Sequence, residues 1–157
     1  MTGDIVRSYA ASAIQKTSVA MGVVFILVSV AGFIPGLTHS AEHLQAAGPG
    51  SEALLLGVFQ VSVLHNIVHF AYGVWGLVAA VNASASRLFL VLGGLVYLVL
   101  WVYGLIAVGN DQLNFIPLND ADNWLHLGLA IVMVALGIIM RSEPRMRPRT
   151  TGTHPVV

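Results

Sequence analysis

Three histidines in apolar segments are the residues of this sequence best suited to chemistry. His65 and His69 are four residues apart, so a helix through them places both imidazoles on one face. His126 lies in a later apolar segment. Imidazoles can bind a divalent metal, coordinate a haem iron or share a proton, and the spacing of the first two lets them reach one ion.

Further polar and small residues extend this face of the helix. At about 100° per residue, Ser62, Asn66, Gly73 and Gly76 lie on the same side as the two histidines. Polar groups in hydrocarbon carry a free-energy cost, so this face must contact other helices or a water pocket. We therefore predict one polar cluster that collects side chains from three helices: Ser62, His65, Asn66, His69, Tyr97, Trp101, Asn119, Asp122, Asn123 and His126.

Three interpretations of this cluster remain open. In the first, it is a structural hydrogen-bond network in which Tyr97 or Trp101 donates to a neutral His69. In the second, His65, His69 and His126 bind a divalent metal. In the third, His126 and one of the other two histidines hold haem b. No carboxylate or thiolate lies on the face of the first two histidines, and short helices leave little room for a porphyrin. We therefore expect no cofactor, and favour a cluster that is structural or binds a small ligand.

A different histidine pattern precedes these segments. His39, Glu42 and His43 match the inverted zinc-protease motif H-x-x-E-H. A zinc enzyme would also need a third ligand on another helix and a substrate cleft, and the nearest carboxylate, Glu52, is too close in sequence. Five-residue matches are frequent by chance, so we interpret this stretch as solvated surface and expect no enzymatic activity from it.

The composition indicates that these residues belong to a membrane protein. The 157 residues are 57% hydrophobic and 9% charged, and the mean hydropathy is +0.83. A soluble domain has about 25% charged residues, and a soluble fold of this size could not bury so much apolar surface. The chain has no cysteine, which excludes disulfides, thiolate metal sites, iron–sulfur clusters and cysteine nucleophiles.

Four continuous apolar runs predict four transmembrane helices, at about 17–34, 54–81, 88–108 and 122–140. A helix rises about 1.5 Å per residue, so about 20 residues cross the hydrocarbon core of a bilayer. We therefore predict an all-α, up-down four-helix bundle over residues 1–140. In this bundle Ser51 to Gln60 forms an outer extension of the second helix.

The basic residues all fall on one side of this arrangement. The seven Lys and Arg residues lie in the N-terminus, in the linker at Arg87 or after Met140, whereas the other two linkers carry acidic residues and no Lys or Arg. The positive-inside rule then places both termini in the cytoplasm. We predict a multi-pass protein of the bacterial cytoplasmic membrane, with a basic, disordered tail at 141–157 on anionic lipid headgroups. Because this basic cluster is adjacent to the membrane, nothing in the sequence supports nucleic-acid binding.

An internal repeat relates the two halves of the chain. A glycine–aromatic–glycine pattern occurs with one spacing in the first and third apolar runs: Gly22, Phe25 and Gly32, then Gly94, Tyr97 and Gly104. His65 and Gly76 of the second run have the spacing of His126 and Gly137 of the fourth. The pattern predicts two tandem hairpins, with His65 and His126 at one depth in the outer leaflet. The alternative is a chance match between apolar sequences.

Two sequence blocks resemble a known family. They are FQVSVLHNIVH at residues 59–69 and FIPLNDADNWLHLG at residues 115–128. Together they closely resemble a family of small bacterial four-helix membrane proteins catalogued as a domain of unknown function, over about Lys16 to Met140. The resemblance implies the four-helix architecture and no activity. It marks as signature residues His65, Asn66, His69, Asn119, Asp122, Asn123 and His126, and it does not include the His39–His43 stretch.

Two functions from different classes are therefore open. One is a non-enzymatic accessory or self-assembling membrane protein, a homo-oligomer or the partner of another membrane protein, with an outer-leaflet His/Asn cluster that is structural or binds a small ligand. The other is a redox protein that binds haem b or a divalent metal through His65, His69 and His126. An absorbance spectrum with elemental analysis would separate them.

Overall fold

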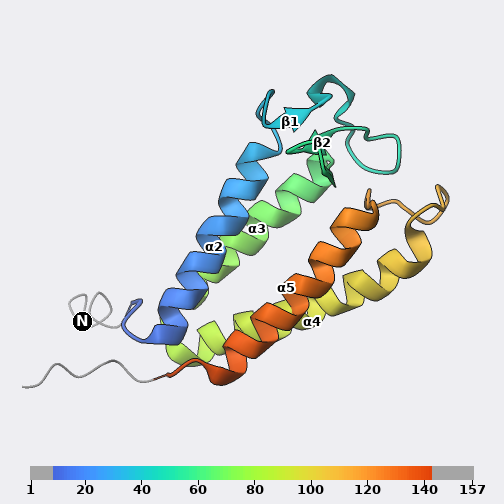
Figure 1. The fold of residues 1–157 in the computed structure, drawn as a ribbon. Coiled ribbons are helices and arrows are strands. Elements are labelled where there is room, and N and C mark those ends of the chain that lie inside the picture. Colours follow the sequence, from blue (N-terminus) through green and yellow to red (C-terminus); the bar gives the residue numbers. More distant parts are fainter. Residues whose placement is uncertain (1–8, 143–157) are drawn as a thin grey trace, which may run out of the picture.

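The computed structural model describes residues 9–142, which form two helical hairpins with a small sheet at one end (Figure 1). In chain order, the α-helices of this part of the chain are α2 (Ala13–Ala31), α3 (Val63–Ala79), α4 (Ala83–Ala107) and α5 (Asp120–Ile139). α2 packs mainly on α3, and α4 packs mainly on α5. The predicted all-α class with four helices is confirmed for these residues, and the sheet is an addition to it.

Contacts between α2 and α3 occur in opposite order along the two helices. Ser18, in the first half of α2, donates its hydroxyl to Gly76 O at 2.7 Å. Ser29, near the end of α2, donates to Asn66 O at 2.7 Å. The two helices are therefore antiparallel, and serine hydroxyls bond the neighbouring backbone at both ends of the contact.

A three-stranded antiparallel sheet separates α2 from α3 along the chain. Its strands are β1 (Thr38–His39), β2 (Leu54–Leu55) and β3 (Phe59–Gln60), in the order β1-β2-β3, and a 3₁₀ turn (Ala41–His43) follows β1. The register pairs Thr38 with Leu55 and Leu55 with Phe59. Figure 1 shows the sheet at the end of the molecule where α2 ends and α3 begins.

The predicted second helix is wrong at its outer end. Residues 54–60 form the β2–β3 hairpin, and α3 begins only after it. Leu56 and Gly57 have positive φ angles of 53° and 71°, which reverse the chain where a helix would continue. Ser62 then caps α3 by accepting a hydrogen bond from His65 N at 3.1 Å. Periodicity alone does not separate a short buried strand from a helix in an apolar run.

Polar caps set the starts of the other helices. α2 and α4 begin before the predicted positions 17 and 88, because Ser12 with Gln15 forms a capping box at α2 and Asn82 caps α4. At α5, Asn119 and Asp122 form a second capping box. The helices therefore extend over polar residues that an apolar run does not include.

Arg87 connects the start of α4 to the end of α5. From the start of α4, its guanidinium donates to the backbone carbonyls of Gly137 at 2.6 Å and Met140 at 3.2 Å. It also donates to Ser142 Oγ at 2.7 Å. A cation here complements the free carbonyls and the negative end of the α5 dipole.

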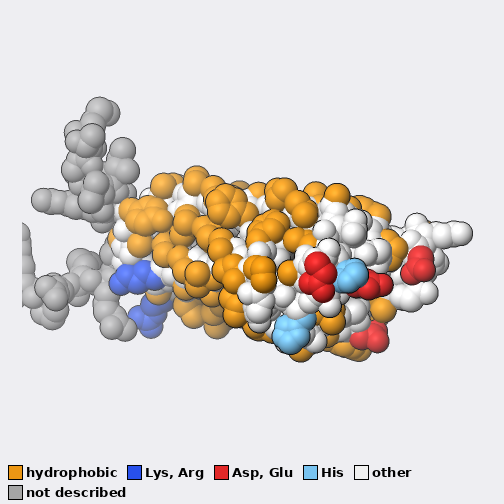
Figure 2. Space-filling model, turned by 90° about the horizontal axis from the view of Figure 1, so that it is seen from above, with side chains coloured by type: hydrophobic (Ala, Val, Ile, Leu, Met, Phe, Trp, Pro, Cys, Tyr) orange, Lys and Arg blue, Asp and Glu red, His pale blue; other side chains and the backbone are white. Residues whose placement is uncertain are grey.

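The outer surface of the helices is that of a membrane protein. α2, α4 and α5 are long and apolar enough to cross a membrane, by length and composition, and α3 is a shorter apolar helix of 17 residues. Figure 2 shows hydrophobic side chains along the length of the molecule, with Lys and Arg at one end and Asp and Glu at the other. The predicted basic tail, 141–157, lies outside the described residues except for Arg141 and Ser142.

Candidate functional site

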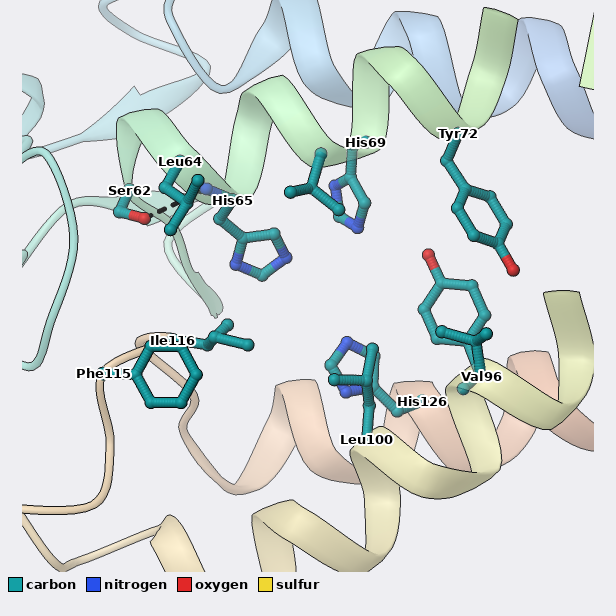
Figure 3. Close-up of a pocket in the computed structure, with 12 residues that line it drawn as sticks. Ser62, Leu64, His65, His69, Tyr72, Val96, Leu100, Phe115, Ile116 and His126 are labelled. Atoms are coloured by element: carbon teal, nitrogen blue, oxygen red, sulfur yellow. Dashed lines mark hydrogen bonds between the residues drawn. The ribbon is translucent and has the colours of Figure 1, made fainter. Parts of the chain in front are cut away.

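The three histidines of the predicted cluster lie together between the hairpins. Figure 3 shows His65 and His69 extending from α3 toward His126, which extends from α5. The ring centroids of His65 and His69 are 4.5 Å apart, and those of His65 and His126 are 6.4 Å apart. His65 and His126 are 7% and 4% exposed, so the site is enclosed by the bundle.

An aromatic pair lies beside the histidines. The rings of Phe25 on α2 and Tyr97 on α4 are stacked, with centroids 5.7 Å apart and an interplanar angle of 6°. Phe25 contacts His69 at 5.8 Å between centroids, and Tyr97 contacts His126 at 5.3 Å. The first hairpin therefore supplies Phe25 and two histidines to a common centre, and the second supplies Tyr97 and one histidine.

Backbone groups of the segments that lead into α3 and α5 lie next to the cluster. Asp122 Oδ2 accepts hydrogen bonds from Gln60 N at 2.9 Å and from Asn119 N at 3.1 Å. The His65 imidazole interacts with the backbone of Pro117, whose only polar backbone group is its carbonyl. Asp122 of the second hairpin and His65 of the first thus each interact with the segment that leads into the helix of the other hairpin.

Many polar atoms in this region have no hydrogen-bond partner among the residues that the structure describes. Buried and unpartnered side-chain atoms are His65 Nδ1, Asn66 Nδ2 and Oδ1, His69 Nδ1, Tyr72 OH, Trp101 Nε1, Asn123 Oδ1 and His126 Nδ1. The predicted bond from Tyr97 or Trp101 to His69 is therefore wrong, because the Trp101 donor and His69 Nδ1 are both unpaired. Trp101 was assigned to the cluster by helical periodicity, which does not determine side-chain partners.

The asparagines of the cluster pack on glycines of the neighbouring helix. Asn66 is fully buried against Gly32, and Asn123 is buried against Gly104. A Cβ at either glycine would collide with the facing amide. The two glycines therefore make room for the asparagines and are part of the site, in addition to their place in the repeated pattern.

These contacts set the register of the internal repeat. In α3 and in α5, an asparagine lies one turn after the N-cap and a histidine lies two turns after it. His126 is therefore equivalent to His69. The predicted equivalence of His126 with His65 is wrong by one helical turn, and the residue equivalent to His65 is Asp122.

Two cavities flank the histidines and follow the same repeat. The first, of about 210 Å³, is lined on the α4 side by Val96, Tyr97 and Leu100, and the second, of about 170 Å³, is lined on the α2 side by Val24, Phe25 and Val28. These two sets are equivalent in the glycine–aromatic–glycine pattern. All three histidines line both cavities, and Figure 3 shows the first.

Metal-ligand geometry is not present in the part of the chain that the structure describes. Among residues 9–142, no group of three or more His, Cys, Asp or Glu side chains is arranged so that it could hold a metal ion. In the H-x-x-E-H motif, His39 lies in β1, whereas Glu42 and His43 lie in the 3₁₀ turn. The Glu42 and His43 side chains are 74% and 56% exposed, in agreement with the interpretation as solvated surface.

Sequence reasoning missed several residues of the site. Phe25 belongs to the repeated pattern and could have been placed by combining that pattern with the polar face of the second helix. Gln60 and Pro117 interact through their backbone, and no pattern of side chains in the sequence predicts such contacts.

Fold and site together define a membrane protein with apolar helices of membrane-spanning length around a buried histidine cluster. The chain belongs to the family described as Domain of unknown function (DUF4383), whose model matches residues 15–139. This agrees with the family resemblance seen in the two sequence blocks. Comparisons with curated proteins and with solved structures found no match.

Proposed function

We propose that this protein is a small, non-enzymatic multi-pass protein of the bacterial cytoplasmic membrane, whose histidine cluster binds a small ligand in the outer half of the bilayer. α2, α4 and α5 have the length and hydropathy of membrane spans. The 17 residues of α3 are at the lower limit for crossing the hydrocarbon core. Because α3 is packed antiparallel along α2, we assign all four helices to an up-down bundle.

The charges support an orientation with both termini in the cytoplasm. Lys16, Arg87 and Arg141 lie at the inner ends of helices, and Figure 2 places the basic residues at one end and the acidic residues at the other. Ile14 N donates to Arg141 O at 3.2 Å, so the described chain begins and ends on this side. By the positive-inside rule this side is cytoplasmic, where anionic lipid headgroups would neutralise the basic tail.

The observation that carries the ligand proposal is the set of unpaired imidazole nitrogens. Nδ1 of His65, His69 and His126 is buried without a partner in each case, and the three rings line two cavities. An unpaired buried polar group costs about 1–3 kcal/mol, so native proteins rarely keep several together. A structural network would pair such atoms, and these three have no hydrogen-bond partner among the described residues. A ligand in the cavities would supply the hydrogen-bond partners that these rings lack.

A small ligand fits the site better than a porphyrin. The stacked rings of Phe25 and Tyr97, 5.7 Å apart, occupy the centre of the bundle directly beside His69 and His126. A macrocycle held between α3 and α5 would have to displace this aromatic pair. The cavities lie to the two sides of the pair, where a smaller molecule enters without such a rearrangement.

The test identifies the molecule that is bound to the purified protein. The full chain, extracted from membranes in mild detergent, should contain a stoichiometric small organic molecule, measured by mass spectrometry of a solvent extract. Absorbance and elemental analysis of the same sample should show no Soret band and no stoichiometric metal. A Soret band or bound metal would instead establish the redox alternative.

Matched histidine variants locate the ligand. The double variant of His69→Ala and His126→Ala should lose the molecule, whereas the double variant of His39→Ala and His43→Ala, at exposed positions, should retain it. Elution volume and thermal unfolding confirm that each variant is folded. Unchanged ligand content in a folded cluster variant would refute the assignment of the site.

A further inference from the structure

The two cavities open toward lipid rather than toward water. Leu64, Val96 and Phe115 at the first cavity are 41%, 46% and 59% exposed, and they lie on the apolar outer surface. Val24 and Leu125 at the second are 49% and 42% exposed. In the membrane of the proposed function, these mouths face acyl chains. A ligand therefore reaches the histidines from the bilayer and must be soluble in it.

The size of each cavity fits one substituted six-membered ring. A cavity of about 150 Å³ holds benzene in an engineered protein core. The cavities here measure about 210 and 170 Å³, so each holds a ring with small substituents. A longer aliphatic tail on such a ring would extend through the apolar mouth into the lipid.

The imidazoles of His69 and His126 are polar groups that line both cavities. Nδ1 of His69 and of His126 is enclosed without a partner. A neutral imidazole carries one N–H, and a buried N–H without an acceptor is rare in proteins. Each of the two equivalent rings therefore has one N–H to donate, and a carbonyl oxygen of a ligand is a matching acceptor.

The walls beside these donors are aromatic. Tyr97 lies 5.3 Å from His126 between ring centroids, and Phe25 lies 5.8 Å from His69. Flat rings pack on aromatic side chains in offset-stacked or edge-to-face geometry. We infer that the two equivalent cavities are binding sites for the headgroups of lipid-soluble quinones, whose carbonyl oxygens accept hydrogen bonds from His69 and His126. This inference rests on the proposed function, because it names the ligand class of the same site.

The test uses menadione and the full chain in nanodiscs of synthetic phosphatidylcholine. The quinone ring of menadione would occupy the cavity, with its fused benzene ring toward the apolar mouth. Equilibrium dialysis with radiolabelled menadione measures binding, and empty nanodiscs correct for partition into lipid. The chain has no cysteine that this quinone could alkylate. Saturable binding of one or two molecules per chain is expected. Partition equal to that of empty nanodiscs would overturn the inference.

Two variants separate hydrogen bonding from shape. His126→Ala should weaken binding about 2- to 10-fold through loss of one neutral hydrogen bond. Leu100→Trp leaves the histidines intact and fills the first cavity, so it should remove one class of site. His43→Ala is the matched exposed control and should bind as the parent does. Parent-like binding in both folded test variants would place menadione elsewhere and overturn the inference.

A second probe separates a site that does not bind quinones from a protein that has no ligand site. Radiolabelled palmitate is dialysed in parallel, because a fatty acid also reaches an apolar mouth from the bilayer. Binding of palmitate that depends on His126, without binding of menadione, would overturn the quinone and keep the ligand site. Absence of any bound molecule in the purified protein, together with no binding of either probe, would refute both.

Discussion

Gly22 on α2 is a position where the addition of a single methyl group should disturb the packing of the first hairpin. A Cβ at Gly22 would be 2.7 Å from Gly73 O, 2.9 Å from Leu77 N and 3.2 Å from Gly76 C. All three neighbours are backbone atoms of α3. Because no flexible side chain can move aside, the Gly22→Ala substitution must separate α2 from α3.

The magnitude follows from the cost of overpacking. Inserting a methyl group into a well-packed contact costs about 1–3 kcal/mol, and alanine in a helix recovers about 0.5–1 kcal/mol relative to glycine. The net loss of unfolding free energy is then about 0.5–2 kcal/mol. For a chain of this size, that lowers the midpoint of thermal unfolding by about 1–8 °C.

The assay is thermal unfolding in detergent, followed by circular dichroism, with Gly128→Ala as the matched control. Gly128 is also a helical glycine, on α5, but a Cβ there meets nothing within 4 Å. Gly128→Ala should therefore leave the midpoint unchanged or raise it. If Gly22→Ala were as stable as this control, the two helices would not be in the close contact described.

Three further predictions test the α5 cap, the inner end and the topology. Asp122→Ala should lower the unfolding free energy by about 1–3 kcal/mol, because the backbone amides of Gln60 and Asn119 lose their acceptor. Asp122→Asn keeps an acceptor oxygen and should lower the unfolding free energy less. Equal midpoints of thermal unfolding for the two variants would contradict this prediction. Arg87→Ala removes donors to the carbonyls at the end of α5 and should measurably lower the midpoint of thermal unfolding. The midpoint of Arg87→Lys should lie between those of Arg87→Ala and the parent. If Arg87→Ala unfolded at the same temperature as the parent, these bonds would contribute nothing to stability. A reporter active only in the cytoplasm should be active when fused after Val157, and activity there of a reporter that requires the cell exterior would refute the topology.

The helices could be predicted because hydrocarbon imposes a simple rule on sequence. Every residue on the outside of a span must be apolar, so α2, α4 and α5 appear as long hydrophobic runs. The same rule fails at the ends of helices. Ser12 and Asn82 are polar caps that lie outside the apolar runs, so the prediction started both helices too late.

The strands could not be predicted from the apolar pattern. Residues 54–60 are as hydrophobic as a helix end, and their fold depends on a reversal at Leu56 and Gly57. A leucine at positive φ gives no sequence signal, because this conformation is rare for such a residue. The register of the repeat is visible in the sequence as Asn-x-x-His, at Asn66 and again at Asn123, but the prediction followed the spacing of His65 and Gly76 instead.

Residues of opposite chemistry occupy one pair of equivalent positions, and a single proline explains the difference. His65 and Asp122 lie in the first turns of α3 and α5, and each faces the segment before the other helix. Gln60 offers an N–H, which needs an acceptor such as a carboxylate. Pro117 has no N–H and offers only a carbonyl, which needs a donor such as imidazole. Asp122 lines the second cavity and not the first. The repeat therefore produces two cavities of similar form, and the proline makes them chemically different, since a ligand hydroxyl finds a carboxylate acceptor in only one.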